Sequence, residues 1–98
     1  MHYTNNVGFI YFLYDGNSVK VGFTTKAPEE RLNEIQTGNP NKLKLIGHFP
    51  GTIRDEKEVH KRWEVVKAKG GSEWFNVNEQ AALDMIQKMY SRYTVLKK

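Results

Sequence analysis

Two short apolar segments separated by a turn occupy the first quarter of the chain. Residues 7–14 form an uninterrupted, aromatic-rich run, and an Asp-Gly-Asn turn sequence follows at 15–17. In residues 18–23, Val19, Val21 and Phe23 fall on one face of an extended chain, and Lys20 and Gly22 fall on the other. This pattern predicts two strands joined as a β-hairpin.

A helix and a third strand are expected in the next stretch. Pro28 suits a first helical position, and Gly38 followed by Pro40 ends a helix over residues 28–37. Leu32 and Ile35 form its inward stripe, with Gln36 at the edge. Residues 42–49 alternate again and predict a strand. Its two faces would carry Leu43, Leu45 and Gly47 on one side, and Lys44, Ile46 and His48 on the other.

The second half of the chain predicts two more helices around a short strand. Thr52 and Asp55 have the spacing of a capping box, which begins a helix expected to run to residue 69. Residues 72–77 contain an adjacent Trp and Phe and predict a short strand, after which Asn78 is expected to cap a last helix. The inward residues would be Val59, Trp63 and Val66 in the first of these helices, and Ala81, Leu83, Met85, Ile86, Met89 and Tyr90 in the second.

The predicted order is therefore β-β-α-β-α-β-α, in one α/β (α+β) domain with helices packed against a small mixed sheet. The chain has 98 residues, of which 39% are hydrophobic and 27% charged, a balance typical of a water-soluble domain. No apolar run is long enough to span a membrane, and the first residues lack the pattern of a secretory signal. We therefore expect a cytoplasmic protein without a membrane partner.

Composition narrows the chemistry further. The absence of cysteine excludes disulfides, a thiol nucleophile and a cysteine-based zinc site. Lys and Arg outnumber Asp and Glu by 15 to 11, and this net charge of +4 is compatible with a polyanionic partner. Residues 85–98 contain basic residues and no acid, which we interpret as a solvated basic tail.

Several common catalytic motifs are missing. The sequence has no phosphate-binding loop, no dinucleotide-binding glycine pattern and no His-Glu-x-x-His zinc helix. Its histidines, His2, His48 and His60, are too scattered for a local metal motif. No nucleophile-elbow pattern surrounds any of its serines.

Five polar residues remain at positions where an apolar or small residue is the simpler expectation. They are Tyr11, Lys20, Arg31, His60 and Glu73. Each one alone has an ordinary structural interpretation, such as a boundary residue on a helix or a cap in a turn. Together they supply what phosphodiester hydrolysis requires: a base for water, a carboxylate for a divalent metal, and cations for the charge that develops on phosphate.

The order of these residues resembles the GIY-YIG nuclease superfamily, in its short stand-alone branch from bacteriophages and bacteria. The resemblance rests on Phe-Ile-Tyr at 9–11, Lys-Val-Gly at 20–22, Pro-Glu-Glu-Arg-Leu at 28–32, Gln-Thr-Gly-Asn-Pro at 36–40, Glu-Val-His at 58–60 and Gly-Ser-Glu-Trp-Phe at 71–75. It implies a GIY-YIG-like domain over residues 1–98. The core would span about residues 8–77, as a three-stranded sheet flanked by helices, and a C-terminal helix and basic tail would follow at 78–98.

The resemblance also implies metal-dependent cleavage of DNA in a bacterial or phage-infected cell. Tyr11 would activate water, Arg31 would stabilise phosphate charge, and Glu73 would hold a single Mg²⁺ or Mn²⁺ ion. His60 would contact phosphate or relay a proton. The chain departs from the superfamily at Lys20, which stands where the second motif tyrosine is expected. This lysine can place a cation beside phosphate, and Tyr11 would then activate water or only position a metal-bound one.

The expected partner is DNA, held through its phosphates with weak sequence specificity. The residues that would contact it are Lys20, Arg31, Lys42 and Lys44. Two other functions stay open. The chain could be a non-catalytic module that binds nucleic acid, a nucleotide or a host or phage protein, for example in phage counter-defence. It could also self-associate as a homodimer, with Trp63 and Trp74 at the interface.

Overall fold

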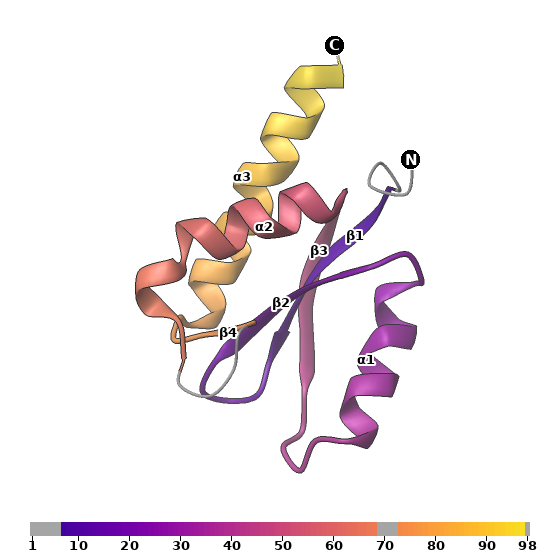
Figure 1. Cartoon of the computed structure of the whole chain (residues 1–98), viewed down its shortest axis with the longest axis vertical. Coiled ribbons are helices and arrows are strands. Elements are labelled where there is room, and N and C mark those ends of the chain that lie inside the picture. The colour runs from indigo at the N-terminus through magenta and orange to yellow at the C-terminus, as the bar shows by residue number, and fades with distance from the viewer. Residues whose placement is uncertain (1–6, 69–72, 98) are drawn as a thin grey trace.

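The computed structural model describes residues 7–68 and 73–97, which form a four-stranded sheet between helices (Figure 1). The central strand β1 (Gly8–Tyr14) lies between β2 (Val19–Thr24) and β3 (Lys44–Gly51). The two-residue strand β4 (Trp74–Phe75) extends the sheet beside β2, so the strand order is β3-β1-β2-β4. All neighbouring pairs in this sheet are antiparallel.

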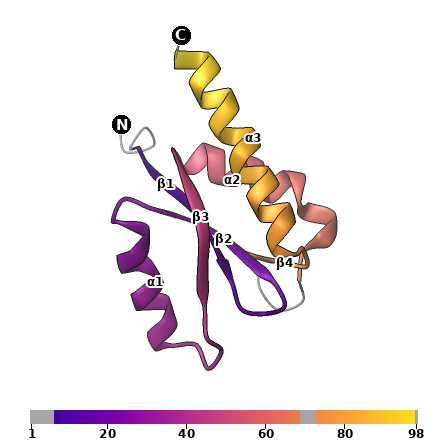
Figure 2. The same ribbon diagram turned by 180° about the vertical axis from the view of Figure 1, so that it is seen from behind.

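Helices cover both faces of the sheet (Figures 1 and 2). Helix α1 (Pro28–Thr37) lies on one face. On the other face lie α2 (Ile53–Arg62), the 3-10 turn η2 (Glu64–Val66), and α3 (Glu79–Lys97), whose last turns extend beyond the sheet. None of the helices in the described part of the chain is both long and apolar enough to cross a membrane.

Each face of the sheet has its own hydrophobic core. The larger core, under α2 and α3, contains fully buried aromatic residues such as Phe12 and Phe75. The smaller core, under α1, contains Tyr11, Leu13 and Leu43. The alternation of side chains along β1 divides its residues between these two cores, and this explains why its sequence is apolar without interruption.

Local sequence signals account for most of the element boundaries. Gly16 has a φ of 97° in the turn between β1 and β2, a conformation that glycine adopts without strain. Helix α1 begins with Pro28 and ends at Thr37 as predicted. The predicted capping box is present, because Arg54 N donates to Thr52 Oγ1 and Thr52 N donates to an Asp55 oxygen at the start of α2. Asn78 also caps its helix as expected.

The predicted element order is confirmed, but the expected count of three strands in the sheet is wrong. Strand β4 joins the same sheet through pairing with Val19 and Lys20. The sheet is also antiparallel rather than mixed. Helix α1 carries the chain back across the sheet, so β2 and β3 run in the same direction on either side of β1.

The predicted extension of the second helix to residue 69 is also wrong. Helix α2 ends at Arg62, and the chain then turns so that Lys67 can pair with Phe75 of β4. Ala68 N donates to Trp74 O at 2.8 Å, and Asn76 N donates to Val66 O at 2.6 Å. These bonds use main-chain groups of Trp74 and Asn76 that the pairing of β4 with β2 leaves free, which favours an extended segment over another helical turn.

A register shift in β3 changes the predicted faces of that strand. Leu45 pairs with Leu13 and Gly47 pairs with Phe12, so Ile46 is the extra residue of a bulge. Beyond the bulge, each residue of β3 faces the side of the sheet opposite to the one predicted. His48 therefore lies opposite Tyr11, on the α1 side.

Two residues of the predicted core stripe in α3 are instead exposed. Leu83 and Tyr90 both have more than a third of their surface in solvent, and Ala82 is the fully buried alanine. The tryptophans that could have formed an interface pack within the chain. Trp63 contacts Phe12 and Phe75, and Trp74 joins the core under α1.

Candidate functional site

Three consecutive residues of β2, at positions 20–22, form the centre of the candidate site. Four of the five predicted site residues belong to this segment or contact it directly, and Arg31 reaches it through Tyr11. The four are Tyr11, Lys20, His60 and Glu73. Tyr11 and Arg31 approach this stretch of strand from the α1 side of the sheet, His60 approaches it from α2 on the other side, and Glu73 lies at its edge just before β4.

Lys20 and Glu73 form an ion pair where β4 joins β2. Lys20 Nζ lies 2.5 Å from Glu73 Oε1, with 14% of the lysine side chain and 41% of the glutamate side chain exposed. The Trp74 ring lies against the lysine, 5.9 Å from Nζ to its centroid. A main-chain hydrogen bond holds the same two segments together, because Val21 N donates to Glu73 O at 3.0 Å.

His60 reaches the same strand from α2. Its Nε2 lies 2.9 Å from the carbonyl oxygen of Val21, so this nitrogen carries the proton and donates. The ring also packs edge-on against Phe75, at 5.1 Å between centroids. His60 therefore satisfies a carbonyl group at the open edge of β2.

A carboxylate that the sequence reasoning missed lies beside this pair. Glu56 on α2 is only 8% exposed, and its Oε2 is 3.9 Å from His60 Nε2. Burial is the main cause that raises the pKa of Glu56, and the nearby charge of Glu73 raises it further, against the opposing effects of His60 and Lys20. The helical spacing was a usable signal, since Glu56 is three and four residues before Val59 and His60 and so shares their face of α2.

Tyr11 occupies the α1 side of the same segment. Its side chain lies directly over Gly22, and a Cβ at position 22 would collide with the phenol ring and its hydroxyl. Only 1% of Tyr11 is exposed. Glycine is therefore required at position 22 by the close approach of the ring, and not by its own backbone conformation.

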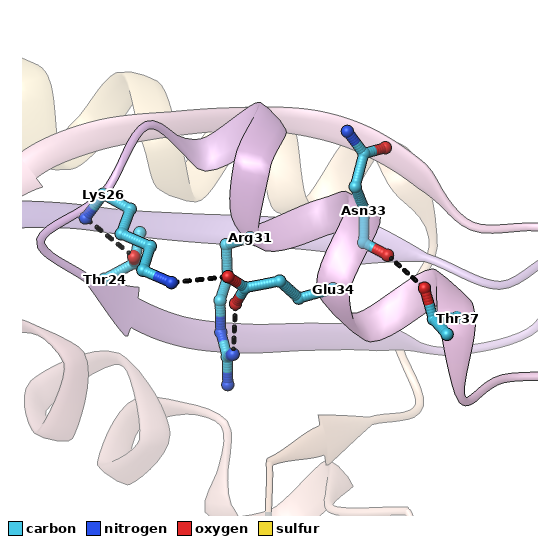
Figure 3. A network of polar contacts seen from close by, with 6 residues as sticks. All are labelled: Thr24, Lys26, Arg31, Asn33, Glu34 and Thr37. Atoms are coloured by element: carbon cyan, nitrogen blue, oxygen red, sulfur yellow. Dashed lines mark hydrogen bonds and ion pairs between the residues drawn. The ribbon is translucent and has the colours of Figure 1, made fainter.

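Arg31 links the tyrosine to the surface. Arg31 Nη1 donates to Glu34 Oε1 at 2.9 Å, and Lys26 Nζ lies 2.5 Å from the other carboxylate oxygen of Glu34 (Figure 3). The hydrogen bond to Glu34 is the largest cause that raises the pKa of Arg31, and the Tyr11 hydroxyl is the second. The same two cations lower the pKa of Glu34.

The two other lysines predicted to bind nucleic acid are not part of this group. Lys44 pairs with Tyr14 on β1, and its Nζ lies 2.6 Å from Glu79 Oε2 at the start of α3. This ion pair is therefore on the face of the sheet opposite α1. Lys42 lies exposed in the loop before β3.

A family comparison now bears on this arrangement. The model of the T5orf172 domain matches residues 8–90, which include every element of the sheet and most of α3. The chain belongs to the T5orf172 domain family. No curated protein and no solved structure matches the chain. The T5orf172 domain points to a nuclease-like or nucleic-acid-related role.

The donor set of this T5orf172 domain fits a hard divalent cation bound by few protein ligands. Glu56 and Glu73 supply carboxylate oxygens beside the single positive charge of Lys20, and such oxygens suit Mg²⁺ or Mn²⁺. Within residues 7–68 and 73–97, no three His, Cys, Asp or Glu side chains converge. An ion bound to one or two carboxylates would retain several water ligands, which is the usual coordination of Mg²⁺ in proteins.

Proposed function

We propose that this T5orf172 domain is a GIY-YIG-type endonuclease or nickase that hydrolyses phosphodiester bonds in DNA with one divalent metal ion. The observation that carries the proposal is that a phenol, a lysine and a carboxylate lie at residues 20–22, with the cation Arg31 beside the phenol and the carboxylate of Glu56 near Lys20 and Glu73. This set matches the needs of phosphodiester hydrolysis.

In this proposal the cations bind the phosphate. Arg31 has a planar group of donors that suits phosphate oxygens, and it is far more accessible than the tyrosine behind it. Lys20 would add a second positive charge from the adjacent strand. Contacts of this kind hold the sugar–phosphate chain without reading bases, so cleavage should have weak sequence preference.

The carboxylates would hold the metal ion. Glu73 is the accessible ligand, with 41% of its side chain exposed, and Glu56 stands behind it as a second oxygen donor. When bound, the ion would act as a Lewis acid on the phosphate and lower the pKa of water. Lys20 forms an ion pair with Glu73 in the free protein, and with Glu73 holding a metal ion this lysine could bind the phosphate instead.

Tyr11 would orient or deprotonate the attacking water. Its hydroxyl lies next to Arg31, so the phenol and the guanidinium could face the same phosphate. Contact with Gly22 and the surrounding core fixes the ring in one position, as a positioned base requires. His60 would act indirectly in this scheme, by holding the edge of β2 that carries the other groups.

A second candidate function is favoured by the burial of Tyr11. With 1% of this residue exposed, a phosphate could bind at Arg31 and Lys20 without access of water to the phenol. The chain would then be a nucleic-acid-binding module that retains the site without turnover. Binding of DNA in the presence of chelator, together with no cleavage when Mg²⁺ is added, would favour this alternative.

A plasmid-nicking assay with two matched glutamate variants tests the proposal. Glu73 and Glu79 are alike in exposure, at 41% and 38%, and each forms one ion pair with a lysine. We expect Glu73→Gln to abolish Mg²⁺-dependent nicking of supercoiled plasmid, and Glu79→Gln to nick like the wild type. Equal nicking by the wild type and Glu73→Gln, or nicking that survives chelator, would reject the proposal.

A further inference from the structure

A cavity lies next to Arg31, between the end of β2 and α1. Its volume is about 270 Å³, and its walls are formed by Phe23, Thr24, Thr25, Lys26, Arg31 and Glu34. Phe23 is the apolar residue among them, and the others supply two cations, one carboxylate and two hydroxyls. The Glu34 carboxylate, bound by both cations, is the acidic group in this wall (Figure 3).

The contacts of Glu34 are of a kind that another anion can replace. Lys26, Arg31 and Glu34 each have more than 40% of their side chains exposed, so water and salt screen both ion pairs. Lys26 binds one carboxylate oxygen and Arg31 binds the other, as they could bind two oxygens of one phosphate. The carboxylate therefore stands where a phosphate group would satisfy the same donors.

We propose that this cavity is a second phosphate subsite for the bound DNA strand, and that Glu34 occupies it in the free protein as an internal competitor. This inference rests on the proposed function, because it assumes that a phosphodiester chain already lies at Arg31. The strand would displace Glu34. Lys26 and Arg31 Nη1 would then bind the phosphate next to the one that is cleaved, and the other N–H groups of Arg31 would stay on the cleaved phosphate.

The remaining wall suits a sugar–phosphate chain. Thr24 Oγ1 accepts a hydrogen bond from Lys26 N at 3.0 Å, which fixes the turn before α1 and so the position of Lys26. Thr25 adds a second hydroxyl in the same wall, and threonine hydroxyls are common donors to DNA phosphates. Phe23 offers an apolar surface to the sugar.

Binding of a short fluorescein-labelled DNA duplex in chelator tests the subsite without requiring cleavage. The variants are Glu34→Gln, the same change in a Lys26→Gln background, and the control Glu30→Gln, which removes one negative charge from an exposed position on the same helix. Glu34→Gln should bind DNA about 3- to 10-fold more tightly than wild type, and the logarithm of its affinity should fall more steeply with salt by about one unit. Most of this gain should vanish in the Lys26→Gln background.

Two results would overturn the inference. One is an equal gain in DNA affinity for Glu34→Gln and Glu30→Gln. The other is a gain in DNA affinity from Glu34→Gln that is unchanged when Lys26 is replaced. Nicking assays on the same proteins separate this inference from the proposed function. If the wild type nicks DNA and Glu34→Gln and Glu30→Gln gain DNA affinity equally, the subsite is rejected and the nuclease proposal is retained. A gain specific to Glu34→Gln in a protein that never nicks DNA supports the subsite and rejects the nuclease.

Discussion

The two sides of β2 hold their polar residues in different ways. On the side where α2 and β4 meet the strand, His60 and Glu73 are bound to the main chain of Val21, and Glu56 is buried behind them. On the side that faces α1, the exposed residues Lys26, Arg31 and Glu34 bind mainly one another. The first group is fixed by tertiary packing, and the second by local ion pairs that solvent can reach.

This difference would suit the two tasks that we propose for the domain, metal binding and DNA binding. A metal ion requires oxygen ligands whose positions are set before it arrives, and attachment to the main chain of a strand provides this. A nucleic-acid backbone is bound by exposed cations that exchange one anion for another. Tyr11 lies between the two groups, since its ring rests on Gly22 and its hydroxyl lies beside Arg31.

The largest expected effect comes from Gly22→Ala, which disturbs both sides at once. The added methyl group would force the Tyr11 ring away from the strand. We expect a loss of about 1–3 kcal/mol in the free energy of unfolding and a loss of about 100-fold in nicking rate. Urea unfolding and the plasmid assay measure the two quantities.

Gly38→Ala is the matched control for this change. No atom lies within 4 Å of a Cβ at position 38, and its φ is −98°. This variant should therefore fold and nick like the wild type. If Gly22→Ala behaves in the same way as Gly38→Ala, the close packing of Tyr11 on β2 is not needed for the site.

Replacement of His60 tests whether its hydrogen bond to the main chain of β2 stabilises the side of the strand where α2 and β4 meet it. His60→Ala leaves the Val21 carbonyl without its donor and should cost about 1–3 kcal/mol of unfolding free energy, measured by urea titration. His60→Gln retains a donor and should recover part of that loss. Equal destabilisation by the two variants would show that the ring, and not its hydrogen bond, stabilises the edge.

Replacement of the buried carboxylate of Glu56 should have a smaller effect on stability, and this effect should depend on pH. Because the pKa of Glu56 is raised in the folded protein, the folded state binds this proton more tightly than the unfolded state. Its contribution to stability therefore falls as pH rises from the unfolded pKa through the raised one. Thermal unfolding in chelator should show Glu56→Gln gaining stability relative to wild type between about pH 4 and neutrality. A constant difference across this range would contradict the raised pKa.

The smallest effect on stability is expected on the exposed side. Lys26→Gln removes an ion pair between two exposed groups and should leave the melting temperature unchanged within error. It should nevertheless weaken DNA binding and reduce its salt dependence. A clear drop in melting temperature would mean that this side, like the other, is part of the structural framework.

The parts of this fold that could be predicted from sequence are those with local causes. The hairpin follows from alternation and a turn glycine, α1 follows from Pro28 and its end signals, and α2 begins at a capping box. The motif residues could be selected because each was polar where packing alone favours an apolar or small residue. Their convergence is predictable only through the resemblance, because strand pairing sets which residues become neighbours.

What could not be predicted depends on contacts between distant segments. The fourth strand exists because residues 66–68 and β2 both pair with Trp74 and Phe75. The bulge at Ile46 turns His48 to the other face, and no single-strand pattern reveals it. Glu56 lies among charged residues and looks solvated in sequence, and its burial comes from the packing of α2 against β2.

Paramagnetic NMR can show whether residues 20–22 and Glu73 form one metal-dependent site. Trace Mn²⁺ added to ¹⁵N-labelled protein broadens the amide signals nearest to the bound ion. We predict that broadening centres on the amides of Lys20, Val21 and Glu73, and that Glu73→Gln removes it. Broadening centred on other acidic residues, such as Asp84 or Glu79, or unchanged in Glu73→Gln, would contradict this account.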